Sequence, residues 1–269
     1  MKILKEDMIG QSNINKFGEK FTIYDYKDYE HIYIIFNESN YKTKTSHDSF
    51  KHGRCFSPYA KTIYNHGYLG EGEYTPTKLI PSINKNRKTN TSEYIAWCGM
   101  FTRCYDKDYH KKKPTYIGCE VCEEWCNFQN FAKWYNENKW KCGDSTMVVD
   151  KDILIKGNKI YSPNTCIIVP QELNSLFTSC KTVRGELPIG VSYTKQGRKH
   201  YRVRVSNHIL ENKRIDLGNY NTIEEAFLVY KENKEKVIKE VADYYKNKYP
   251  KFPKKLYDAL YAYEVEITD

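Results

Sequence analysis

Residues 201–230 have the sequence YRVRVSNHILENKRIDLGNYNTIEEAFLVY, in which two hydrophobic periods follow one another. In the first half, apolar and polar residues alternate, which is typical of a strand with one buried face. After residue 221, apolar residues recur every three or four positions, as in an amphipathic helix. Thr222 and Glu225 form a capping box that begins this helix. We therefore predict strands at 189–193, 201–206 and 213–217, and a helix at 223–245.

The alternation also predicts what each face of this sheet carries. Tyr201, Val203 and Val205 are expected to face the helix, and Arg202 and Arg204 the opposite side. Residues 181–221 contain nine Lys and Arg against three Asp and Glu. A basic three-stranded ribbon suits the major groove, where arginine contacts guanine or phosphate. The candidate DNA contacts are Arg198, Lys199, Arg202, Arg204, Lys213 and Arg214. The alternative is a solvated basic surface without a ligand.

Residues 188–245 resemble the AP2/ERF DNA-binding domain. The shared features are Gly190-Val191, the alternating Arg202 and Arg204, the run Leu217-Gly218-Asn219-Tyr220, and Thr222-Ile223-Glu224-Glu225-Ala226 at the start of the helix. The resemblance implies a three-stranded sheet packed on one helix, with the sheet reading duplex DNA.

Residues 146–178 have the order strand, loop, strand, helix. They resemble the ββα core of HNH nucleases, in the phage homing-endonuclease branch, on Val149-Asp150-Lys151-Asp152-Ile153, Tyr161-Ser162-Pro163-Asn164-Thr165-Cys166 and Val169-Pro170-Gln171-Glu172-Leu173-Asn174. Helical residues upstream, with Trp97, Arg103-Cys104-Tyr105, Cys119 to Cys122 and Trp125, resemble the lead-in of that branch. The resemblance implies one Mg²⁺ or Mn²⁺ held by Asp150 and Asn174, with Asn164 in the central orienting position.

The same segment departs from the family at the general base. Lys151 stands where the resemblance expects the histidine, and no histidine lies between His110 and His200. A shift of one residue would put Asp150 in the histidine position and Asp152 in the carboxylate position. An ordinary aspartate, with a pKa near 3.9, is a weak base at neutral pH, and a lysine base needs a strongly lowered pKa. Three interpretations stay open: an active nuclease with an unusual base, an inactive core that still binds DNA, and a coincidental ββα in which Asp150 is a turn residue.

A zinc site is the competing interpretation of the cysteines. Cys119, Cys122 and Cys126 have Cys98, Cys104 and Cys142 nearby in the sequence. Structural zinc sites usually contain two Cys-x2-Cys pairs, and only one is present here. We therefore do not expect structural zinc.

The rest of the chain completes an α+β prediction. Strand-like runs at 21–26, 31–36 and 41–45, with glycine-rich turns after them, predict a small N-terminal β barrel over residues 1–80, an SH3-like module. The polar stretch 81–92 is predicted to be a linker. The expected domains are then the HNH-like core at 93–180, the AP2-like domain at 186–247, and a C-terminal tail at 248–269.

Composition limits the class of protein. The 269 residues carry a net charge of +9, with 25 tyrosines and a mean hydropathy of −0.77. We expect no membrane span and no signal peptide, which predicts a cytosolic protein with reduced cysteines. If the chain is phage-encoded, that compartment is the host cytoplasm.

These features together predict a metal-dependent HNH-type endonuclease that acts on double-stranded DNA. The contrasting hypothesis is a DNA-binding protein without catalysis, such as a regulator or an anti-defence factor built on an inactive core. A third is an inhibitor that binds a host or phage protein. Salt-dependent duplex binding would favour the first two, because counterion release weakens nucleic-acid binding as salt rises.

Overall fold

The computed structural model describes residues 5–80, 87–177, 185–194, 200–211 and 213–269. The chain is a mixture of helices and several small sheets, which confirms the α+β class. It forms two compact units. The first contains Met1–Glu137 and Lys159–Ser162, and the second contains Asn138–Asn158 and Pro163–Asp269. The expected nuclease core at 93–180 is therefore divided between the two units.

The first unit begins with an open four-stranded antiparallel sheet. Its strands follow the chain in the order β1 (Ser12–Ile14), β2 (Lys20–Asp28), β3 (His31–Phe36) and β4 (Lys42–Thr45). Phe21, Ile23, Ile32 and Ile34 form the buried face.

The predicted barrel is wrong for the described residues, because the two edge strands of this sheet do not pair with each other. Both edge strands are short, and β4 contributes two lysines. The buried face is instead covered by Met8 of α1 (Lys5–Met8) and Phe50 of α2 (His47–Lys51).

The remainder of the first unit is mostly helical. It contains the hairpin β5 (Thr77–Ile80) and β6 (Arg87–Asn90), then α3 (Ser92–Tyr105), α4 (Lys107–Lys112), η1 (Pro114–Tyr116), α5 (Glu123–Cys126) and α6 (Phe128–Asn138). Strands β7 (Glu120–Val121) and β9 (Ile160–Tyr161) pair in parallel. Trp97 packs its ring against Phe101 and Phe128, with ring centroids 5.0 and 5.4 Å apart.

The linker prediction is wrong where it can be compared with the structure. Residues 81–86 lie outside the described part, but Arg87–Asn90 pairs with β5 as strand β6. Thr91 then caps α3, because its side chain accepts a hydrogen bond from the Tyr94 N–H. The polar side chains of this stretch belong to an exposed hairpin and a helix cap, which have the same composition as a linker.

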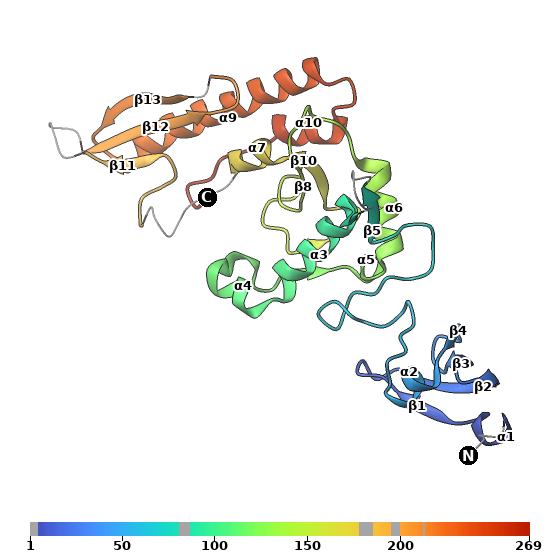
Figure 1. The fold of residues 1–269 in the computed structure, drawn as a ribbon. Coiled ribbons are helices and arrows are strands. Elements are labelled where there is room, and N and C mark those ends of the chain that lie inside the picture. Colours follow the sequence, from blue (N-terminus) through green and yellow to red (C-terminus); the bar gives the residue numbers. More distant parts are fainter. Residues whose placement is uncertain (1–4, 81–86, 178–184, 195–199, 212) are drawn as a thin grey trace. The chain divides into compact units, whose positions relative to one another are not determined.

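The second unit contains the predicted ββα segment and the three-stranded sheet. Strand β8 (Met147–Asp150) pairs antiparallel with β10 (Ile167–Pro170), followed by α7 (Gln171–Asn174) and η2 (Ser175–Phe177). The sheet β11 (Val191–Tyr193), β12 (Tyr201–Asn207) and β13 (Lys213–Tyr220) packs on α9 (Ile223–Lys248), which runs along it in Figure 1. The strands predicted at 189–193, 201–206 and 213–217 and the helix predicted at 223–245 are therefore present.

One hydrophobic core joins the parts of this unit. Val169 and Leu173 of the ββα segment, Val203 of the sheet, Ile238 of α9 and Leu260 of α10 (Lys254–Tyr261) all belong to it, and none is more than 1% exposed. The expected boundaries at 180–186 and at 247–248 therefore do not separate hydrophobic cores. The C-terminal tail is a helical element of this core.

Two residues, Thr222 and Gly190, explain where α9 and the three-stranded sheet of this unit begin. The Thr222 hydroxyl accepts a hydrogen bond from the Glu225 N–H at 3.2 Å, as the capping box predicts. Gly190 has a φ of +76°, and a Cβ at that position would overlap the Tyr230 ring. Only glycine allows the first strand to approach α9 so closely. Within the described residues, no helix combines the length and the apolarity needed to cross a membrane.

Candidate nucleic-acid interface

Asp150, the predicted metal ligand, lies at the end of β8 and closes a turn. Its Oδ1 accepts hydrogen bonds from the backbone N–H groups of Asp152 and Ile153, both at 2.7 Å. Burial raises the pKa of Asp150, the two backbone hydrogen bonds lower it, and the balance lies above the ordinary value. This carboxylate therefore stabilises the local chain path, as an aspartate in a turn does.

Lys151, which stands in the position of the base, is buried inside the following loop. Its residue exposure is 5%, and its Nζ donates to both carboxylate oxygens of Asp152 at 2.8 Å and to the Asn158 carbonyl at 2.5 Å. The Asn158 side chain donates back to the Lys151 carbonyl at 3.0 Å. An ammonium has three N–H donors, and three acceptors surround it here. These hydrogen bonds tie the Lys151 side chain into the fold of its own loop.

Asn164 and Asn174 come from different parts of the same segment. Asn164 is exposed, and its carbonyl accepts a hydrogen bond from Lys255 at 3.1 Å. Asn174 is the last residue of α7 and is half-buried. In the hairpin register Asp150 lies opposite Ile167, whereas α7 follows Pro170, which lies opposite Met147. The helix therefore begins about 10 Å along the strands from Asp150, at roughly 3.4 Å per residue.

The resemblance to HNH nucleases was the basis for the metal prediction. In the described part of the chain, no three or more His, Cys, Asp or Glu side chains come together as a metal-binding group. The donors that the resemblance assigns are one carboxylate and one amide, and Asp150 already uses an oxygen on two backbone N–H groups. Mg²⁺ is usually bound by one or two carboxylates with water and substrate oxygens completing the shell. This donor set is a poor fit, and we derive no reaction step from a metal.

The cysteines considered for zinc are free thiols in the described residues. Burial raises the pKa of Cys98, Cys122 and Cys126. Cys104, Cys119 and Cys142 are buried in packed surroundings. Packing accounts for their burial.

The second predicted site is the face of the sheet that points away from α9. We call it the arginine face and define it by register as Ser192, Arg202, Arg204, Ser206, Arg214, Asp216 and Asn219. On the opposite face Val203 and Val205 are at most 1% exposed. The alternation predicted from the sequence is therefore present, and it puts three arginines on one exposed surface.

Asp216 organises two of these arginines. The Arg202 Nε donates to Asp216 at 2.7 Å and its Nη2 contacts the same oxygen, while Arg204 lies 3.8 Å from it. Hydrogen bonding to Arg202 holds the pKa of Asp216 below its ordinary value. The side chains of Arg202 and Arg204 remain 42% and 37% exposed, so they stay accessible to a ligand.

The other candidates for DNA contact have different surroundings. Lys213 lies opposite the buried Asn207, on the α9 side by register, and pairs with Glu211 at 2.5 Å. Arg214 lies opposite Ser206 on the arginine face and is exposed. Arg198 and Lys199 lie outside the described residues.

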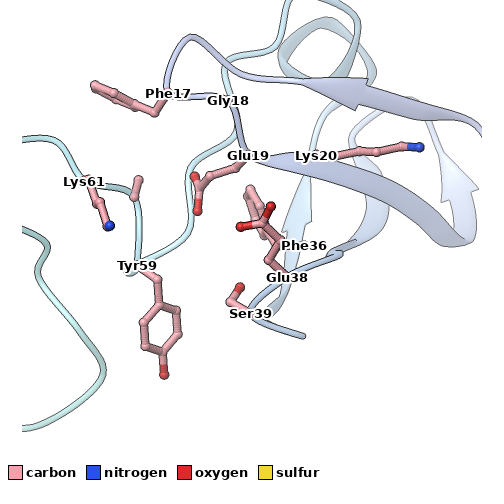
Figure 2. A pocket seen from close by; sticks show the side chains of 10 residues that line it. Phe17, Gly18, Glu19, Lys20, Phe36, Glu38, Ser39, Tyr59 and Lys61 are labelled. Atoms are coloured by element: carbon pink, nitrogen blue, oxygen red, sulfur yellow. The ribbon is translucent and has the colours of Figure 1, made fainter. Parts of the chain in front are cut away.

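Two neighbouring pockets in the first unit were missed by sequence reasoning. One, of about 300 Å³, is lined by Glu19, Glu38, Tyr59 and Lys61 among others, and Figure 2 shows these side chains around it. Glu19 is held in place by hydrogen bonds from Asn15, at 2.7 Å, and from Ser57. The other pocket, of about 600 Å³, is lined by aromatic residues and by Gln129. The residues that line these pockets come from separate segments of the chain, so no sequence motif predicts them.

Comparison of the chain with family models, with curated proteins and with solved structures finds no match.

Proposed function

We propose that the chain binds duplex DNA through the arginine face of its second unit. The observation that carries the proposal is the exposure of Arg202, Arg204 and Arg214 on one side of a three-stranded sheet whose other side is packed on α9. A rigid sheet of this width fits the major groove, and arginine forks pair with guanine or phosphate. The resemblance of this segment to AP2/ERF domains points to the same ligand.

Asp216 contacts both Arg202 and Arg204 on the arginine face. It neutralises part of the positive charge, but it also fixes the guanidinium of Arg202 in one orientation. Arg204 is farther from this carboxylate, at 3.8 Å, and Arg214 is exposed. We therefore assign base or phosphate contacts to Arg204 and Arg214, with Arg202 held beside them by Asp216.

The test is duplex affinity measured by fluorescence anisotropy over a range of salt concentrations. The double variant Arg204→Ala and Arg214→Ala is expected to bind about 30-fold more weakly, with a salt slope reduced by about 1.8 for the two lost phosphate contacts. The matched control is Lys236→Ala with Lys239→Ala, which removes the same charge from exposed positions on α9. An equal loss in both double variants would mean that binding follows net charge and not this surface.

Metal-dependent cleavage of the bound duplex is the second candidate. The observation that favours it is the order β8, β10 and α7, with Asp150 at the end of the first strand, as in the HNH-type core. Plasmid nicking with Mg²⁺ or Mn²⁺ that disappears in Asp150→Ala, but persists in Asp144→Ala, would support it. An intact plasmid in every reaction, together with salt-dependent binding, would leave DNA binding as the function.

A further inference from the structure

Arg103 in α3 is an unusual arginine of the first unit. Arg103 is half-buried, its Nε donates to the Tyr161 hydroxyl at 2.8 Å, and its guanidinium lies 5.3 Å from the centre of the same ring. Tyr161 is 2% exposed. Within the described residues, the Arg103 side chain donates a hydrogen bond to Tyr161 through Nε, and the groups that act on its pKa are tyrosines with no carboxylate among them.

Such an arrangement has a cost that a ligand can offset. A half-buried charge without a counter-ion is unfavourable, because arginines that lose contact with water usually pair with a carboxylate. Burial lowers the pKa of Arg103, the nearby tyrosines Tyr161, Tyr116 and Tyr109 raise it, and the balance is upward. The guanidinium therefore stays charged, and its two remaining N–H edges suit an oxyanion.

The surroundings of Arg103 are also basic. Lys107, Lys111, Lys112 and Lys113 follow it in the sequence, against only Asp106 and Asp108. Asp108 is paired with Lys111 at 2.6 Å, and Asp106 caps α4 and accepts a hydrogen bond from Tyr64.

The segment is tied to the helix that carries Arg103. His110 lies with its Nε2 2.8 Å from the Arg103 carbonyl, and Lys159 donates to the Thr115 carbonyl at 2.8 Å. The segment that carries these lysines is therefore fixed to the C-terminal end of α3.

We propose that Arg103, positioned by Tyr161, binds a phosphate group. The phosphate belongs either to a polynucleotide strand or to a small phosphate compound. The site lies in the first unit and does not depend on the arginine face, although its assignment to DNA rests on the proposed function. Arginine can hold two phosphate oxygens at once, and the lysines of residues 107–113 add a general attraction.

The first arm of the test uses inorganic phosphate and the full chain. Thermal unfolding is measured in phosphate and in chloride at matched ionic strength and pH. Phosphate is expected to raise the wild-type midpoint by about 3 °C, since a ligand of the folded state stabilises it. Arg103→Gln should lose this shift, and Arg103→Lys should lose most of it because a lysine lacks the fork. Arg54→Gln, an exposed arginine of the same unit that pairs with Asp48, is the matched control and should keep the shift.

The second arm measures duplex binding by the same variants. If a DNA strand supplies the phosphate, Arg103→Gln lowers affinity about tenfold and reduces the salt slope by about 0.9, whereas Arg54→Gln does not. Loss of the phosphate shift without loss of duplex affinity assigns the site to a small phosphate compound. An equal phosphate shift in wild type and Arg103→Gln overturns the proposal.

Two further comparisons keep the result interpretable. If Arg103→Gln fails to fold by circular dichroism, Tyr161→Phe replaces it, because this change removes only the hydroxyl that holds the Arg103 Nε. It should reduce the phosphate shift, and an unchanged shift would contradict the positioning role. A wild-type chain that binds no duplex would reject the proposed function, while the phosphate arm would still decide the role of Arg103.

Discussion

The loop at residues 150–158 and the arginine face both carry charged residues that the sequence predicts to be functional, but the two regions use those charges differently. In the loop, Lys151 and Asp152 bind each other, and Asp150 binds the backbone. On the sheet, Arg202 and Arg204 share one carboxylate and remain more than one-third exposed. A charge that is saturated by its own loop stabilises the fold, whereas an exposed, ordered charge can bind a partner.

The same comparison separates two kinds of sequence evidence, strand periodicity at Arg202 and Arg204 and residue identity at Asp150 and Lys151. The alternation of Arg202, Val203 and Arg204 is a geometric property of a strand, so the structure had to put the arginines on one face. The identity of Asp150 and Lys151 gives no such guarantee, because a metal ligand and a turn residue can be the same amino acid. Local periodicity therefore predicted surfaces better than residue identity predicted chemistry.

The largest effect is expected when Lys151 is replaced by alanine. The change removes the ammonium that donates to the Asn158 carbonyl and to the Asp152 carboxylate. These hydrogen bonds hold the two ends of the loop at residues 150–158 together. We expect the free energy of unfolding to fall by about 3 kcal/mol, because the packing of the buried lysine stem and its hydrogen bond to the Asn158 carbonyl are lost together, measured by urea denaturation. Lys156→Ala is the control, since Lys156 is 35% exposed and pairs with Asp269 at its surface, and it should cost less than 1 kcal/mol. Wild-type stability in Lys151→Ala would instead make the lysine available for chemistry.

A smaller change in the free energy of unfolding is expected at Asp150, where Asp150→Asn should be stabilised and Asp150→Ala destabilised. Its pKa is higher in the folded chain than its ordinary value of 3.8, so the folded state holds the proton more tightly. Stability is therefore lost as the pH rises from that value through the folded pKa. Asp150→Asn keeps an oxygen for the two N–H groups and removes the buried charge, and it should be more stable than wild type at pH 7 by about 1 kcal/mol.

The stability of Asp150→Ala, and that of Asp150→Asn at acidic pH, test the same carboxylate. Asp150→Ala leaves two N–H groups without an acceptor and should be less stable than wild type by about 2 kcal/mol. As the pH falls below 3.8 the gain in Asp150→Asn should shrink, because the wild-type carboxyl then becomes protonated in both the folded and the unfolded chain. A destabilised Asp150→Asn at pH 7 would show that the carboxylate charge itself is needed at this position.

The smallest effect is expected at Asp216 on the arginine face. Asp216→Asn removes a negative charge that competes with DNA, so duplex affinity should rise about threefold, with a steeper salt dependence. Ser206→Ala is the control, because Ser206 is an uncharged neighbour on the same face. A fall in affinity would show that holding Arg202 in place matters more than the added positive charge.

Much of the fold follows from local patterns, and the errors share a physical cause. The sheet at 191–220, the helix that begins after Thr222 and the β8–β10 hairpin follow from alternation, helical spacing and capping. The closed barrel and the linker were wrong because closure depends on whether distant edge strands meet, and because a polar hairpin has the composition of a loop. Arg103 was noticed only as part of a motif, since its tyrosine partner lies 58 residues away.

The sequence by itself determined the three-stranded sheet and the long helix of the second unit, and the side of the sheet on which its arginines lie. Strand alternation, helix period and caps act over a few residues, so they are present in any local stretch of chain. The tertiary structure alone decided that Lys151 is buried against Asn158, that the C-terminal helix shares a core with the ββα segment, and that Arg103 meets Tyr161. These outcomes depend on burial and on contacts between residues that are distant in the sequence. A charged side chain that is buried is usually paired within the fold, and it then has a structural role.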